Sequence, residues 1–317
     1  MDKNSVLLIL VLPCYNEESA LGQSIETLLA YFNELIADGE ISEDSRLLLV
    51  DDGSADRTWE IIEEFHERNG RILGLKLSRN EGHQTAIYAG MADAIDRGAE
   101  VVITIDADLQ QDMHAIPRFL SEYRRGCDIV YGVRSSRDTD SFFKRTTGSG
   151  YYRLMSLLGC ELIPNSADYR LMSKRAVEAL LKYEERDLFI RGIIPTMGYP
   201  TGKVVFDVKE REAGESKYTI WKMLHLAMDG ITSFSIRPIR IVTILGFLIL
   251  FMSGIMIIHV LWDYFHGNTV SGWSSILASL WFLGGVGIFS IGVVGEYVGR
   301  AYLEAKKRPR FFIEKKL

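Results

Sequence analysis

The first 134 residues alternate short apolar runs with segments of helical periodicity. The apolar runs are LLILVLP, RLLLVDDGS, ILGLKLS, VVITIDAD and DIVYGVR. Their near-continuous Leu, Ile and Val content is typical of strands that are buried on both faces. The segments between them, such as SIETLLAYFNELIA and TWEIIEEFHERN, predict amphipathic helices. This alternation predicts an α/β domain with a parallel sheet that is covered by helices on both faces.

Polar residues follow the predicted strands at the carboxyl ends, where sheets of this kind bind their ligands. They are Asn16 and Glu17 after the first strand, Asp51 and Asp52 after the second, Asp106 and Asp108 after the fourth, and Arg134 after the fifth. We therefore expect these side chains to face one crevice. A GxGxxG turn is missing after the first strand and GxxxxGK[ST] is absent, so another nucleotide-binding scheme is needed.

The pattern is less regular from about Ser141 to Lys217. This part mixes the helix-like SGYYRLMSLLG with ADYRLMSKRAVEALLKY, and VVFDVKEREA predicts a further strand. We expect it to form the acceptor side of the site.

Two long apolar segments near the end of the chain are candidate membrane spans. Residues 241–262 and 273–295 contain no Asp, Glu, Lys or Arg, and each is long enough to cross a hydrocarbon core. The loop between them has no Lys or Arg, whereas basic residues flank the pair on both sides, which predicts cytoplasmic ends. The alternative, a buried hairpin of core helices, is disfavoured because neither segment has a polar stripe.

The segment before the first span has apolar residues at helical spacing with Lys and Arg among them. It predicts an amphipathic helix in the membrane interface, and the alternative is a surface helix packed on the domain. The chain then divides into a cytoplasmic α/β domain (1–216), an interfacial helix (217–238), a two-helix transmembrane hairpin (239–300) and a basic cytoplasmic tail (301–317). Gly295 and Gly299 form GxxxG, a spacing that favours helix association and hence a homo-oligomer through the spans.

Composition narrows the functional classes further. The net charge is -6 and no long basic face occurs in the first two thirds, which argues against a nucleic-acid partner. The three cysteines are scattered without CxxC spacing, so neither a disulfide framework nor a zinc site is indicated.

Asp106 and Asp108 stand one residue apart at the end of a predicted strand. Two carboxylates in this arrangement can share a hard divalent cation, since Mg²⁺ is characteristically held by one or two carboxylates and substrate phosphates. The alternative is a loop turn in which each aspartate accepts hydrogen bonds from local backbone amides.

Eight motifs, in this order and followed by two spans, resemble the polyprenyl-phosphate glycosyltransferases, which are inverting enzymes of the GT-A fold. The motifs are LPCYNEE, VDDGSADRT, LSRNEGHQTAIYAG, IDADLQ, YGVR, KRTTG, ADYRLMSKRAV and AGESKY. The resemblance covers nearly the whole chain. It implies a UDP-sugar donor, a polyprenyl phosphate acceptor, a lipid bilayer and Mg²⁺ or Mn²⁺, with the catalytic domain at the cytoplasmic membrane.

The resemblance also assigns site residues. It implies that Asp106, Asp108 and Gln110 coordinate the metal at the diphosphate. The nucleotide would be bordered by Pro13, Tyr15 and Glu17 and contacted by Asp52, which could instead cap a turn. Arg134 and Arg145 match residues expected to bind the acceptor phosphate, for which guanidinium groups are suited. The motif RxxGxSK, with Arg211, Ser216 and Lys217, is expected to form a loop over the donor or the lipid phosphate.

Asp168 matches an active-site aspartate of the family that usually stands within GDFRL. Here Ala167 and Tyr169 replace the Gly and Phe, but the carboxylate is retained. It could orient the acceptor or act as a base, and the sequence leaves both open. His83 in GHQ is similarly open between a phosphate contact and a structural role.

The expected activity is transfer of a hexose, with glucose favoured, from a UDP-sugar to a polyprenyl phosphate with inversion. A processive polysaccharide synthase is the first alternative, but its QxxRW motif is absent because none of the five tryptophans follows an arginine. A catalytically silent membrane adaptor is the second. It would have little reason to retain the set Asp106, Asp108, Gln110, Arg134 and Asp168.

Overall fold

The computed structural model describes residues 5–135, 163, 165–185, 189–207 and 272–317, with isolated helical positions between 242 and 258. The interfacial segment 217–238 and most of the first predicted span lie outside the described residues. So do Arg145, Arg211, Ser216 and Lys217. Two units can be distinguished, one of residues 1–152, 161–218 and 308–317 and the other of residues 153–160 and 219–307.

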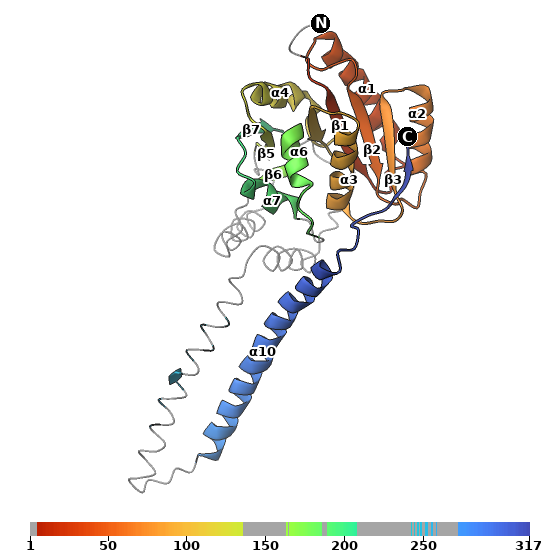
Figure 1. The fold of residues 1–317 in the computed structure, drawn as a ribbon. Helices are drawn as coiled ribbons and strands as arrows, with labels where there is room; N and C mark the ends of the chain where they lie inside the picture. The colour runs from red at the N-terminus through yellow and green to blue at the C-terminus, as the bar shows by residue number, and fades with distance from the viewer. Residues whose placement is uncertain are drawn as a thin grey trace. The chain divides into compact units, whose positions relative to one another are not determined.

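The first unit contains a single mixed sheet (Figure 1). In the described residues its order is β7-β5-β6-β4-β1-β2-β3-β8. The strands are β1 (Leu8–Cys14), β2 (Arg46–Asp51), β3 (Ile72–Leu77), β4 (Val101–Thr104), β5 (Ile129–Arg134), β6 (Ser166–Ser173), β7 (Thr201–Phe206) and β8 (Ile313–Lys316). Strands β1 to β4 pair in parallel, which confirms the α/β prediction for this part of the chain.

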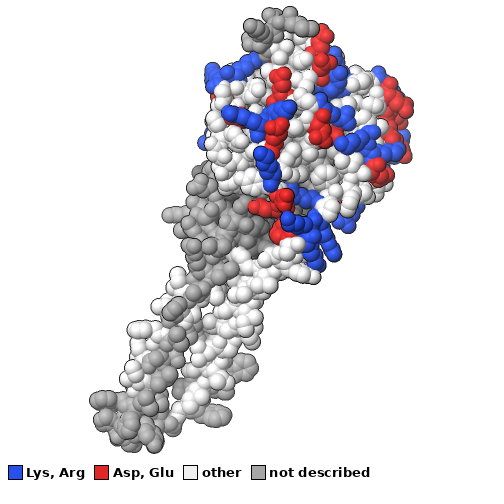
Figure 2. Space-filling view, viewed as in Figure 1, with Lys and Arg blue, Asp and Glu red and all other residues white. Residues whose placement is uncertain are grey.

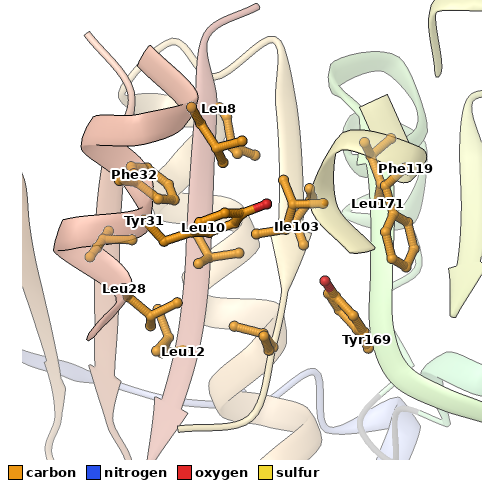
Figure 3. Packing of buried hydrophobic residues seen from close by; sticks show 14 of the residues in the cluster. Leu8, Leu10, Leu12, Leu28, Tyr31, Phe32, Ile103, Phe119, Tyr169 and Leu171 are labelled. Atoms are coloured by element: carbon orange, nitrogen blue, oxygen red, sulfur yellow. The ribbon is translucent and has the colours of Figure 1, made fainter. Parts of the chain in front are cut away.

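The helices lie on both faces of this sheet, as the alternating pattern predicts. They are α1 (Leu21–Ala37), α2 (Thr58–Arg68), α3 (His83–Asp96), the 3-10 turn η1 (Met113–Ala115), α4 (Ile116–Arg124), α6 (Lys174–Leu180) and α7 (Ile190–Thr196). On one face, Leu28 and Phe32 of α1 pack against the even-numbered leucines of β1 (Figure 3). On the other face α3 approaches closely, since a Cβ at Gly90 would lie 2.4 Å from Val11 Cγ1.

Strand β6 runs antiparallel between β4 and β5, and the sequence pattern did not separate it from the helix that follows. Thr104 lies opposite Arg170, and Tyr131 pairs with the same arginine from the other side. Tyr169 packs in the core beside Phe119, with ring centroids 4.6 Å apart (Figure 3). Because β6 is antiparallel, its first residues lie at the edge where β4 and β5 end, so Asp168 reaches the predicted site.

The segment 301–317 differs from the basic tail that we expected. Residues up to Ala305 continue the helix α10 (Trp273–Ala305), and β8 then pairs antiparallel with β3 as the edge strand of the catalytic sheet. The basic residues are used in this contact: Lys316 Nζ lies 2.6 Å from the buried Asp93 Oδ1, and Lys315 Nζ lies 3.0 Å from Glu63 Oε1. Carboxylates on α2 and α3 therefore hold the strand to its own domain.

In the second unit, α10 has the length and composition of a membrane span. Among the described residues it is the one helix that passes this test, over Phe282–Ala305. On the face of the molecule that Figure 2 shows, most of the described part of this helix carries no charged side chains. Large apolar residues such as Ile288 and Ile291 are more than 70% exposed, which suits a lipid environment. Both predicted spans remain predictions, and α10 is a candidate for the second of them by its length and composition.

We predict that Asp128→Asn lowers the free energy of unfolding by about 1–3 kcal/mol near neutral pH. The Arg175 guanidinium and the Ser173 hydroxyl both bond the Asp128 carboxylate and hold its pKa below the ordinary 3.8, against its burial. The ionised Asp128 carboxylate therefore contributes its full stabilisation at pH values above its ordinary pKa of 3.8. This stabilisation is lost as the pH falls through the lower pKa that the group has in the folded protein.

Thermal melts of the full chain in detergent, at pH 7 and at about pH 3, measure this effect. The gap between wild type and variant should narrow at the lower pH. An equal gap at both pH values would contradict the prediction.

Candidate active site

The loop after β4 places the two DxD carboxylates at the carboxyl edge of the sheet. Gln111 fixes Asp106 from both sides, since its Nε2 donates to Asp106 Oδ2 at 2.6 Å and its Oε1 accepts from the Asp106 N–H at 3.0 Å. Leu109 has a φ of 48°, an uncommon value for a residue with a bulky side chain. The turn that presents the carboxylates is thus held in a constrained conformation.

Asp108 is more exposed than Asp106 and bonds Gln110. The Gln110 N–H donates to Asp108 Oδ1 at 3.2 Å, and its side-chain Nε2 donates to Oδ2 at 2.8 Å. An amide nitrogen has no lone pair for a metal, so a ligand role for Gln110 would require its Oε1. The local bonds of Asp108 match the turn-capping alternative, and the same two oxygens are hard ligands suited to a divalent cation.

The two aspartates fit a cation that is shared with phosphate groups. Burial raises the pKa of Asp106, and the charges of Asp168 and Asp108 raise it further, while His83 and Arg191 act in the opposite direction. A cation would relieve this repulsion. In the described part of the chain no group of three or more His, Cys, Asp or Glu side chains could hold a metal alone. Magnesium sites need no more than one or two carboxylates when phosphates complete the shell.

Asp168 is buried within β6 and is surrounded by cationic groups. The Thr104 hydroxyl donates to the Asp168 carbonyl, which fixes the backbone of β6 against β4. Arg170 Nη2 donates to Oδ1, and Arg191 bonds both oxygens, with Nε 3.0 Å from Oδ1 and Nη2 2.8 Å from Oδ2. Burial would raise the pKa of Asp168, but His83 and the two arginines outweigh it and hold the pKa well below the ordinary range.

His83 is the first residue of α3 and stands between two carboxylates. Its Nε2 lies 3.5 Å from Asp168 Oδ2 and 3.6 Å from Asp106 Oδ1. Burial would lower the pKa of His83, but the hydrogen bond to Asp168 and the charge of Asp106 outweigh it and raise the pKa. The structure therefore brings His83 into the predicted site, where the sequence left its role open.

Asp51 is the last residue of β2 and Asp52 follows it, and the two carboxylates have different surroundings. Asp52 accepts the Glu81 N–H at 2.8 Å and the Gly82 N–H at 2.9 Å, so its carboxylate holds the loop before α3. Asp51 is fully buried, and its Oδ2 has no hydrogen-bond partner among the residues that the structure describes. Its burial raises its pKa. A buried carboxylate oxygen without a partner favours a ligand contact at this strand end.

The residues predicted to border the nucleotide lie around the end of β1. Pro13 pairs in register with Val50 of β2, Tyr15 is 48% exposed, and the Glu17 N–H donates to Thr58 Oγ1 at 2.9 Å. The side chain of Tyr15 is thus accessible to a ligand.

The predicted acceptor residue Arg134 ends β5 at the same edge of the sheet. Its N–H donates to the Asn165 carbonyl at 3.2 Å, and the preceding Val133 pairs with Ser166 at the start of β6. The register therefore brings Arg134 to the end of β6 that carries Asp168.

Three residues of the site were missed by the sequence reasoning. Arg170 and Arg191 bond Asp168, and Gln111 bonds Asp106. Arg191 is 23 positions from its partner and belongs to no motif that we identified. Gln111, the second glutamine of LQQD, could have been noticed as a polar residue that follows the DxD turn directly.

Comparison with known proteins agrees with this geometry. The model of glycosyl transferase family 2 matches residues 9–181. An uncharacterized glycosyltransferase, YkoT of Bacillus subtilis, is 48% identical over 314 residues, which is 99% of this chain and 93% of that protein. The bactoprenol glucosyl transferase of Shigella phage SfX is 38% identical over 310 residues, which is 96% of this chain and 98% of that protein.

A solved mannosyltransferase of Pyrobaculum calidifontis, in complex with GDP-Man and Mn²⁺, aligns with 73% of this chain and 71% of its own at 15% identity and a TM-score of 0.46. The assignment to a family rests on the sequence matches. The chain therefore belongs to glycosyl transferase family 2, and its resemblance to the polyprenyl-phosphate glycosyltransferases of the GT-A type is confirmed.

Proposed function

We propose that this protein transfers glucose from UDP-glucose to a polyprenyl phosphate at the cytoplasmic face of the membrane, with inversion at the anomeric carbon. The observation that carries the proposal is the cluster at the ends of β4 and β6, where Asp106 and Asp168 meet His83 and Arg191. Relatives that are named bactoprenol glucosyl transferases, similar over nearly their whole length, support the sugar and the acceptor.

In this mechanism Asp106 and Asp108 would hold Mg²⁺ or Mn²⁺ together with the donor diphosphate. When bound, the cation neutralises the charge that develops on the departing nucleotide. The exposed ring of Tyr15 and the buried Asp51 and Asp52 lie at neighbouring strand ends, where we place the nucleoside.

The acceptor is the second substrate. Its phosphate is already anionic near neutral pH, so attack on the anomeric carbon needs orientation and charge neutralisation more than deprotonation. Arg134 and Arg145 would supply that positive charge.

The path of the chain supports two crossings of the bilayer. The strands up to Phe206 and the strand β8, which follows α10, belong to the same unit, because β8 pairs with β3. If α10 crosses the membrane, the chain must cross once more between Phe206 and Trp273 for both parts to lie on one side. The apolar segment 241–262 is the candidate for this second crossing.

The direct test is incubation of the purified full chain with polyprenyl phosphate and a panel of radiolabelled nucleotide sugars. We expect label in the lipid fraction with UDP-glucose. Processive synthesis would give a polymer instead of one sugar for each lipid, and a silent adaptor would give no product with any donor.

We predict that Asp108→Ala abolishes transfer while the domain stays folded, because Asp106 alone would hold the cation poorly. Initial rates with added Mg²⁺ or Mn²⁺, together with a melting curve, measure both properties. Glu67→Ala, at an exposed position of α2, is a control that should keep full activity. Full turnover by a folded Asp108→Ala enzyme, or by wild type in excess chelator, would refute the metal assignment.

We predict that Arg134→Ala and Arg145→Ala each lower kcat/KM for polyprenyl phosphate about tenfold or more and leave UDP affinity nearly unchanged. A charge-assisted contact of this kind contributes about 1.5–3 kcal/mol. Lysine at either position should restore activity only in part, since an ammonium group keeps the positive charge but cannot make the two parallel hydrogen bonds of a guanidinium group. Calorimetry with UDP beside lipid kinetics separates the substrates, and weakened UDP binding with normal lipid kinetics would place the arginine on the donor side.

For the topology, we predict that a membrane-impermeant thiol reagent labels cysteines engineered in residues 263–272 of intact cells and does not label a cysteine at Lys306. The absence of Lys and Arg in that loop, against the basic flanks, is the reason. The reverse labelling pattern would place the catalytic domain away from cytoplasmic nucleotide sugars.

A further inference from the structure

We infer that Asp168 is a positioning residue that fixes Arg191 and His83 to receive a phosphate group of the substrates, and that it does not act as a base. This inference rests on the proposed function and deepens it. It adds Arg191, which lies outside the motifs described above, to the substrate site.

The first argument is the occupancy of the Asp168 carboxylate. Oδ1 accepts from Arg170 and from Arg191, and Oδ2 accepts from Arg191 while His83 Nε2 lies 3.5 Å away. Arg170 is 1% exposed and cannot turn to solvent. A base must present a lone pair to the proton that it removes. Both oxygens of Asp168 are already engaged by cationic donors, and the low pKa of this group agrees with that arrangement.

The second argument is the arrangement of the two helices that start near this carboxylate. Arg191 is the second residue of α7, and His83 is the first residue of α3. The Ile190 N–H at the start of α7 donates to Gln84 Oε1 of α3 at 2.9 Å. The two hydrogen bonds from Arg191 to Asp168 connect α7 to β6, and the bond from Ile190 to Gln84 connects α7 to α3. The three elements are therefore joined beside the Asp168 carboxylate.

The third argument is the position of the cations relative to the DxD carboxylates. His83 Nε2 lies 3.6 Å from Asp106 Oδ1, and the charge of Arg191 also acts on Asp106. The side chain of Arg191 is 38% exposed, so it reaches the solvent-accessible side of the cluster, unlike Arg170. A guanidinium held rigidly by a carboxylate is pre-organised for a phosphate oxygen. This phosphate can come from the donor diphosphate or from the lipid acceptor.

The experiment is a double-mutant cycle on the full-length enzyme in detergent with Asp168→Asn, Arg191→Gln and the pair. Each single change should lower kcat/KM about 10- to 100-fold, because either one breaks the same fork. The kcat/KM of the double variant should lie within about threefold of that of the less active single variant. If Asp168 is a base instead, Asp168→Asn alone should nearly abolish turnover, and the two losses should multiply. That result would overturn the inference.

A matched control pair lies at the other end of β6, where Arg175 bonds Asp128. Asp128→Asn should leave the rate constants unchanged, and its combination with Arg191→Gln should match Arg191→Gln alone. Melting curves identify any variant that is unfolded. The Asp168→Asn protein could fail to fold if the buried Arg170 loses its partner. In that case the inference is tested with the Arg191→Gln and Arg191→Lys proteins.

Binding of UDP with Mn²⁺ and of inorganic phosphate, measured by calorimetry, distinguishes the source of the phosphate and needs no turnover. Arg191→Gln should weaken UDP binding if the donor is held, or raise KM for polyprenyl phosphate if the acceptor is held, and Arg191→Lys should restore part of the loss. Unchanged UDP binding together with unchanged lipid kinetics would overturn the inference. A wild-type protein that binds UDP but transfers no sugar would refute the proposed function separately.

Discussion

The buried pair of Arg170 and Asp168 is the interaction on which the arrangement of the site depends. Both side chains are nearly inaccessible to solvent, and an unpaired charge in such a place would be strongly unfavourable. The pair is compatible with folding because the two groups neutralise each other and Arg191 and His83 add further donors. Strand β6 can therefore carry two ionised groups through the centre of the sheet, between β4 and β5.

This constraint explains why the site was only partly predictable from the sequence. The parallel strands β1 to β4 follow from local apolar runs, and the DxD turn follows from its place after one of them. Strand β6 places Asp168 and Arg170 two residues apart, on the same face of a short strand that is followed directly by α6. Its pattern depends on neighbours on both sides, which local periodicity does not record. Arg191 was missed for the same reason, since its contact with Asp168 forms only in the folded chain.

The C-terminal segment shows the same limit at another edge of the sheet. Its basic residues suggested a cytoplasmic tail. In the structure, Lys315 and Lys316 of β8 instead pair with Glu63 of α2 and Asp93 of α3. Gly74 of β3 leaves room for this packing, because a Cβ there would lie 2.8 Å from Leu317 Cδ1. The strand covers an edge of the sheet that would otherwise be open to pairing with another chain. It also makes the end of α10 continuous with the catalytic unit, which is why an even number of membrane crossings follows if α10 is a span.

The charge arrangement also bears on how such an enzyme divides its chemical work. A glycosyl acceptor with a neutral hydroxyl needs a base with an accessible lone pair, whereas a phosphate acceptor already carries the attacking charge. A carboxylate locked by two guanidinium groups would serve the first kind of reaction poorly. In the second kind it has a use, because it fixes cations that offset the charge of two phosphate-bearing substrates brought together. The paired state of Asp168 is therefore compatible with the anionic acceptor that we propose, since such an acceptor needs no carboxylate base.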